Sequence, residues 1–66
     1  HSNAADYIRI GDILVKEDIS KAEDFYLKIL NDPKLSKYKR QFAYALDEVI
    51  QKKNRGYVYR PRNKKQ

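Results

Sequence analysis

Apolar residues recur at the three- and four-residue spacing of an amphipathic helix in three separate segments of this chain. The segments cover residues 5–17, 21–31 and 33–53. Their apolar members are Tyr7, Ile8, Ile10, Leu14 and Val15 in the first, Ala22, Phe25, Tyr26, Ile29 and Leu30 in the second, and Leu35, Tyr38, Phe42, Ala45, Leu46, Val49 and Ile50 in the third. The pattern predicts an all-α protein with three helices.

Helix-start signals separate the three segments. Ser20 followed by Glu23 has the spacing of a capping box, which predicts that the second helix begins near residue 21, with Asp18 as the alternative N-cap. Asp32 is a favourable N-cap for the third helix, and Pro33 suits its first position. Since both connections are short, neighbouring helices should run antiparallel and form a compact three-helix bundle.

Gly11 lies in the middle of the apolar face of the first segment. A glycine there lowers helix propensity by about 1 kcal/mol, so we expect a compensating close approach of another helix. A kink or a ligand contact would be the alternatives. The centre of the core is predicted to consist of Phe25, Ile29, Phe42, Leu46 and Val49.

The helical pattern stops at the C-terminal end of the third segment. Asn54 or Gly56 is expected to provide a left-handed C-terminal cap, and the residues that follow form an extended basic tail. Residues 1–4, with the sequence HSNA, resemble the remnant of a cleaved tag. The expected organisation is therefore a remnant at 1–4, a helical domain at 5–54 and a basic tail at 55–66.

Charge is divided unevenly between the two halves of the chain. Residues 1–33 contain four basic and seven acidic residues, whereas residues 34–66 contain eleven basic and two acidic residues. The positive charge concentrates in KLSKYKR, residues 34–40, and from residue 52 onward. Such clusters are typical of a surface that binds a polyanion, although a solvated helix face is the alternative for the first cluster.

The tail adds aromatic residues to its positive charge, a combination that suits stacking on bases and contacts to phosphates. We therefore expect a non-enzymatic domain that binds nucleic acid, DNA or RNA, through this tail and the start of the third helix. The alternatives are that the tyrosines pack on the bundle without binding, or that the tail is a basic localisation or membrane-surface signal. The candidate residues are Lys34, Lys37, Arg40, Lys52, Lys53, Arg55, Tyr57, Tyr59, Arg60, Arg62, Lys64 and Lys65.

The tail sequence YVYRPRNKK, residues 57–65, resembles the basic extension that follows the last helix of high-mobility-group boxes. In that family a Tyr-x-Tyr-Arg-Pro-Arg run lies along DNA, and the resemblance implies the same role for this tail. It covers nine residues; the chain has no Trp and is shorter than such a box.

Residues 7–33 are similar to one tetratricopeptide repeat, with Gly11, Ala22, Tyr26 and Pro33 at comparable positions. The interval from Gly11 to Ala22 is one residue shorter than in that family, and no second copy follows in register. This similarity implies a helical hairpin that contacts another protein or a second copy of the chain. A protein-interaction or dimerisation module within a larger protein is thus the alternative function.

Composition argues against several other classes of protein. The chain has no Cys, its one His is in the expected remnant, and no glycine-rich phosphate loop is present, so we expect no enzyme activity, metal or cofactor. Adjacent carboxylates such as Glu23 and Asp24 point apart on a helix. No apolar run reaches the roughly 18 residues of a membrane span. We expect an intracellular protein, cytoplasmic or nuclear, since the lack of Cys permits a reducing compartment.

Overall fold

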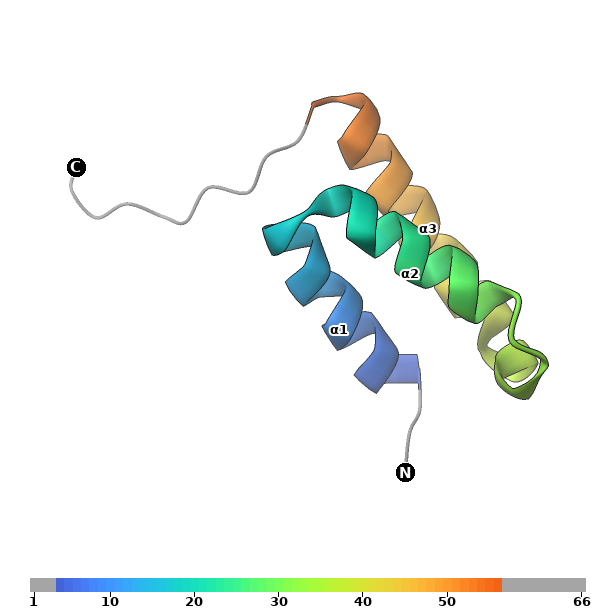
Figure 1. Ribbon diagram of the computed structural model, residues 1–66. Coiled ribbons are helices and arrows are strands. Elements are labelled where there is room, and N and C mark those ends of the chain that lie inside the picture. The colour runs from blue at the N-terminus through green and yellow to red at the C-terminus, as the bar shows by residue number, and fades with distance from the viewer. Residues whose placement is uncertain (1–3, 57–66) are drawn as a thin grey trace.

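The computed structural model describes residues 4–56 as three α-helices and one short 3-10 helix (Figure 1). The helices are α1 (Ala4–Glu17), α2 (Ile19–Leu30), η1 (Pro33–Tyr38) and α3 (Lys39–Asn54). No strand occurs in this range. The predicted all-α three-helix bundle is confirmed, and its first helix begins one residue earlier than expected. The expected extended tail at residues 57–66 lies outside the described residues, as do residues 1–3.

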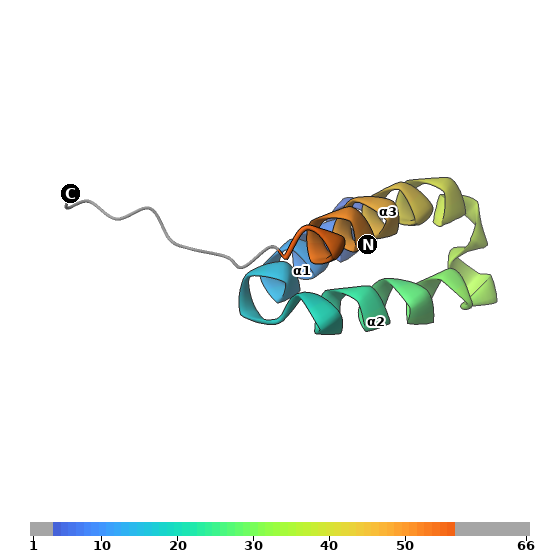
Figure 2. The same ribbon diagram turned by 90° about the horizontal axis from the view of Figure 1, so that it is seen from above.

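The α2 helix lies at the centre of the arrangement, because it contacts both other helices more extensively than they contact each other. Figure 2 shows α2 and α3 running antiparallel, with η1 closing one end of the hairpin. The opposite end of α3 lies beside the start of α2, where the Lys53 ammonium contacts the Glu23 carboxylate at 2.7 Å. The two ends of α3 therefore belong to opposite ends of the bundle.

The start of α2 differs from the expected capping box. Asp18 is the N-cap, and its carboxylate accepts a hydrogen bond from the Ser20 amide at 3.0 Å. The helix consequently begins at Ile19, two residues before the predicted start. Ile19, the first residue of the helix, is partly buried and packs against the core.

The third predicted helix is divided into two parts. Asp32 caps η1 as expected, accepting a hydrogen bond from the Lys34 amide at 2.9 Å, and Pro33 occupies the first turn. Leu35 then leaves the α region (φ −109°, ψ 15°), so residues 33–38 form 3-10 turns and the α-helix begins only at Lys39. The prediction of one continuous helix over 33–53 was wrong, because three-residue spacing fits a 3-10 turn equally well.

Gly56 ends α3 in the left-handed conformation that the sequence suggested. Its φ is +74°, and its amide donates to the Lys53 carbonyl at 3.0 Å. A residue without a Cβ adopts this conformation at little cost, so the helix can close its last turn here.

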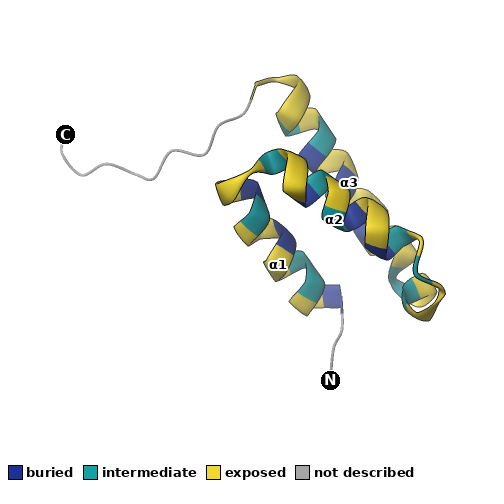
Figure 3. Cartoon of the chain, viewed as in Figure 1, coloured by how far each residue is buried: buried dark blue, intermediate teal, exposed yellow. Residues whose placement is uncertain are grey.

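The core is formed by apolar residues of all three helices (Figure 3). Phe42 is fully buried at its centre, with its ring edge-to-face against Tyr7 at 5.7 Å and against Tyr38 at 6.0 Å between centroids. Ile29, Leu46 and Val49 are buried as predicted, whereas Phe25 is only half-buried. The complete buried apolar set is Ala4, Val15, Ala22, Tyr26, Ile29, Phe42, Leu46 and Val49.

Tyr26 occupies the central buried position of α2 that was expected for Phe25, because Gly11 leaves space for its ring. The Tyr26 ring lies so close to Gly11 that a Cβ added there would meet the hydroxyl and would lie 2.7 Å from ring atom Cε2. The Tyr26 hydroxyl donates a hydrogen bond to the Ile8 carbonyl at 3.4 Å, which satisfies its polar end. The expected close approach of a second helix at Gly11 is confirmed.

Burial also changes the acidity of this phenol. Removal from water raises the pKa of Tyr26 to about 12, and the nearby carboxylates of Asp12 and Glu48 act in the same direction. All three effects disfavour the phenolate, so the folded chain holds the neutral form more firmly than the unfolded chain does.

Replacing Gly11 with Leu should lower stability by roughly 1–3 kcal/mol, because the new side chain overlaps the Tyr26 ring. Helix propensity alone would favour the substitution. The measurement is thermal unfolding followed by circular dichroism. Ala5→Leu, at an exposed position of the same helix, is the matched control and should leave the melting temperature nearly unchanged. An unchanged melting temperature for Gly11→Leu would contradict the close packing.

The free energy of unfolding should fall between pH 10 and pH 12 as the unfolded chain releases the Tyr26 proton and the folded chain retains it. A pKa difference of about two units corresponds to a loss of roughly 2–3 kcal/mol. Tyr26→Phe has no phenol to ionise and should lack this part of the decline. Denaturant unfolding of both proteins across this pH range measures the difference; parallel curves would show that the hydroxyl is not held neutral.

Phe42→Ala should destabilise the domain by about 3–5 kcal/mol, because it removes a fully buried ring that contacts two other rings. Such a loss approaches the whole stability of a small domain. Phe42→Leu retains part of the apolar volume and should cost less than Phe42→Ala, although it loses both ring–ring contacts. Chemical denaturation of the three proteins tests this order, and equal stability of Phe42→Ala and the parent chain would show that the ring is dispensable.

Candidate nucleic-acid interface

The junction between η1 and α3 is held to the core by aromatic contacts. The half-buried Tyr38 ring packs against Phe42, and Phe42 in turn packs against Tyr7 of α1. No side chain of η1 is fully buried, so this contact is the main apolar attachment of the junction, together with the half-buried Leu35. Residues that surround Tyr38 are thereby given a defined position at one end of the bundle.

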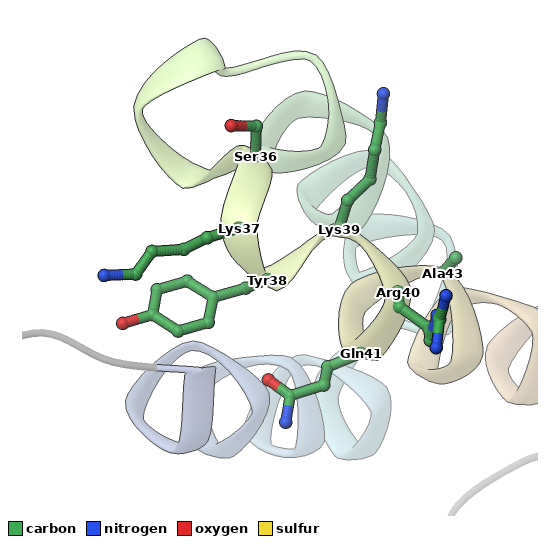
Figure 4. A pocket seen from close by; sticks show the side chains of 7 residues that line it. All are labelled: Ser36, Lys37, Tyr38, Lys39, Arg40, Gln41 and Ala43. Carbon is green, nitrogen blue, oxygen red and sulfur yellow. The ribbon is translucent and has the colours of Figure 1, made fainter.

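A shallow concavity of about 810 Å³ lies at this junction (Figure 4). Three cationic side chains line it, and no carboxylate does. Figure 4 shows Lys37 running alongside the Tyr38 ring, while Lys39 and Arg40 extend from the first turn of α3 in other directions. We call this surface the basic concavity; its lining residues are Ser36, Lys37, Tyr38, Lys39, Arg40, Gln41 and Ala43.

The cations of the basic concavity are not neutralised by the fold. Within residues 4–56, no carboxylate forms an ion pair with Lys37, Lys39 or Arg40. The Lys37 ammonium instead lies 5.5 Å from the centroid of the Tyr38 ring, at the distance of a cation–π contact. Lys39 and Arg40 are exposed and keep their donors available for an external anion.

The position of these cations is electrostatically unfavourable for the helix itself. Lys39 and Arg40 occupy the first turn of α3, where the helix dipole repels positive charge. Tyr38, the N-cap, provides no side-chain hydrogen bond, and the first turn contains no acidic residue. An anion bound in the concavity would therefore relieve repulsion among the cations.

Lys34, another residue of the predicted site, lies in η1 beside the concavity but does not line it. Its side chain is exposed, and its amide is already used by the Asp32 cap. The structure thus brings together Lys37 and Arg40 from the predicted set and adds Lys39. The sequence placed Lys39 in the same basic cluster, and its position in the first turn of α3 explains why it belongs to the site.

The other described candidates, Lys52, Lys53 and Arg55, lie at the far end of α3. A helix of 16 residues is about 24 Å long, so these residues and the basic concavity do not form one site. Lys53 is also engaged: its hydrogen bond to Glu23, strengthened by the negative charge of that carboxylate, raises the pKa of Lys53. Lys52 is half-buried, whereas Arg55 is exposed at the helix end.

The remaining candidates belong to the tail and lie outside the described residues. They are Tyr57, Tyr59, Arg60, Arg62, Lys64 and Lys65. The tail follows Gly56, so it begins at the end of α3 that is remote from the basic concavity.

Tyr44 is a surface residue that the sequence reasoning missed. It lies on α3 one turn after Arg40, and 74% of its side chain is exposed. Residues four apart share one face of a helix, so Tyr44 and Arg40 are neighbours. The sequence could have identified Tyr44 as a surface residue, because it is an aromatic residue outside the apolar face of its helix.

Two further classes of site can be addressed for the described part of the chain. Between residues 4 and 56, no group of three or more His, Cys, Asp or Glu residues is arranged to hold a metal ion. In the same range, no helix combines the length and apolar character needed to cross a membrane.

Comparisons with known proteins provide no relative for this chain. No protein-family model matches it, and no curated protein or solved structure matches it either.

Proposed function

We propose that this chain is a non-enzymatic helical domain that binds nucleic acid, DNA or RNA, through the basic concavity and the basic tail. The observation that carries the proposal is the set of unneutralised cations in the concavity. Lys37, Lys39 and Arg40 all line one shallow surface, and none has a carboxylate partner among residues 4–56. Phosphate groups match these donors in charge and in hydrogen-bonding capacity.

Lys53, at the other end of α3, differs from the cations of the basic concavity in its ion pairing. Lys53 is paired with the Glu23 carboxylate. No carboxylate pairs with Lys37, Lys39 or Arg40 within residues 4–56, and the helix dipole adds to the electrostatic repulsion at Lys39 and Arg40. Local violations of stability rules are expected where a surface serves binding.

The tail contributes a second group of charges to the proposed interface. From residue 52 onward, seven of fifteen residues are Lys or Arg, and Tyr57 and Tyr59 lie among them. Its similarity to the extension of high-mobility-group boxes favours contact with a nucleic-acid backbone. The concavity and the tail would contact separate parts of the same ligand.

A second candidate function is contact with another protein or a second copy of this chain. The observation that favours it is the pair Ile10 and Ile13 on α1, which are 45% and 50% exposed and lie one turn apart. They form a small apolar surface of the kind found at weak protein contacts. Sedimentation of the free chain over a range of concentrations tests this candidate, and Ile13→Asp should abolish any self-association.

Nucleic-acid binding by the full chain should weaken steeply as salt increases. If about four or five phosphates are neutralised, the slope of log affinity against log salt will be near −4 for duplex DNA. Replacing Lys37, Lys39 and Arg40 together with Gln should reduce the magnitude of the slope by about 2–3. Fluorescence anisotropy of a labelled oligonucleotide measures both values. Replacing Arg60, Arg62, Lys64 and Lys65 with Gln provides the corresponding test of the tail.

The matched control removes the same charge from another surface. Arg9, Lys21 and Lys28 are exposed on α1 and α2, and their joint replacement with Gln should leave the slope nearly unchanged. Equal weakening by the control would show that net charge, rather than the basic concavity, determines binding. Failure of the full chain to bind any oligonucleotide at low salt would reject the proposal and leave the protein contact as the surviving candidate.

A further inference from the structure

We infer that the basic concavity takes single-stranded nucleic acid, with Tyr44 as the surface on which an unpaired base stacks. This inference rests on the proposed function and specifies its ligand. It begins with the unusual exposure of Tyr44, whose side chain is 74% accessible. The other large apolar side chains on the surface of residues 4–56 are exposed by 45–50%.

The remaining tyrosines of the described chain have structural roles, whereas Tyr44 has none. Tyr7 and Tyr38 pack their rings on Phe42, and Tyr26 fills the space beside Gly11. Within residues 4–56, no other aromatic ring contacts Tyr44. The ring is therefore largely exposed to a planar ligand, and such rings in proteins that bind single strands stack on bases of any sequence.

The position of Tyr44 connects it to the phosphate-binding surface. Ala43, its neighbour in sequence, lines the basic concavity, and Arg40 lies one turn before it on the same face of α3. Side chains four residues apart in a helix have Cβ atoms about 5–6 Å apart. A base on Tyr44 would thus leave its phosphate within reach of the Arg40 guanidinium.

Two carboxylates follow Tyr44 on α3, on the side away from the basic concavity. Asp47 and Glu48 are exposed in the next turn of α3. The Asp47 carboxylate accepts a hydrogen bond from the side-chain amide of Gln51 at 2.9 Å. A phosphate backbone would be repelled there, so the strand should run from Tyr44 toward Lys39 and Lys37. The same carboxylates oppose insertion of α3 lengthwise into the major groove of a duplex, where they would face phosphates on both sides.

The test compares the full chain with three variants of Tyr44, using a labelled oligothymidylate and a duplex of equal length. Tyr44→Ala should weaken binding of the single strand by about tenfold or more, and binding of the duplex by less than about twofold. Tyr44→Phe retains the ring and should bind like the parent chain. Leu27→Ala, at an exposed apolar residue of α2, is the matched control and should leave both affinities unchanged.

Tyr44→Trp supplies a direct reading of stacking, because the chain contains no other Trp. Its fluorescence should be quenched by the oligothymidylate and much less by the duplex. Melting temperatures of all variants should match that of the parent chain, since the side chain is mostly exposed.

Each contrary result has a distinct meaning. Equal binding of the single strand by Tyr44→Ala and the parent chain would overturn the inference while leaving the proposed function intact, provided that the Lys37, Lys39 and Arg40 replacements still weaken binding. Equal weakening of both ligands would overturn it by showing that Tyr44 does not distinguish unpaired bases. A change in sedimentation of the free chain on Tyr44→Ala would also overturn it and assign the ring to a protein contact. If the parent chain binds neither ligand, the proposed function fails with it.

Discussion

The contact between the Tyr26 ring and the backbone at Gly11 determines how α1 and α2 lie against each other. A ring can occupy that space only because no Cβ is present, and the ring then excludes water from the centre of the bundle. Once Tyr26 points inward, Phe25 is turned toward the rim of α2 and is only half-buried. Val15, Ala22 and the buried residues of α3 complete a core around this contact. With so few buried side chains, the domain depends strongly on each of them.

The candidate site depends on the same core through a short series of rings. Tyr7 contacts Phe42, Phe42 contacts Tyr38, and the Tyr38 ring lies beneath the Lys37 ammonium. Packing of α1 against α3 is thereby linked to the placement of a cation on the surface. The junction of η1 and α3 needs this link, because no side chain of η1 is fully buried.

Much of the fold follows from the sequence, because helix periodicity and local capping are properties of neighbouring residues. The Asp32 cap, the Gly56 end and the close packing at Gly11 were all predicted in this way. Other features depend on residues distant in sequence. The choice of Tyr26 over Phe25 depends on the space at Gly11, and either ring satisfies the periodicity of α2.

The candidate site shows the same division between local and distant information. Lys37, Lys39 and Arg40 belong to one short basic segment of the sequence, and all three line the concavity, although Lys39 was not among the candidate binding residues. The neutralisation of Lys53 could not be predicted, because its partner Glu23 is 30 residues away. The 3-10 turns of η1 were not predicted either. They place Ser36, Lys37 and Tyr38 on the same surface as the first residues of α3.

The length of α3 sets a spacing for any ligand that meets both proposed contact regions. The helix separates the basic concavity from the start of the tail by about 24 Å, so a ligand must span at least this distance to contact both regions. A shorter oligonucleotide would engage one region at a time, and each contact would act alone. A longer one would hold the second region at a high effective concentration once the first is bound. Affinity would then rise once the ligand is long enough to reach both regions. The helix α3 would thus set a minimum ligand length in addition to contributing to the core.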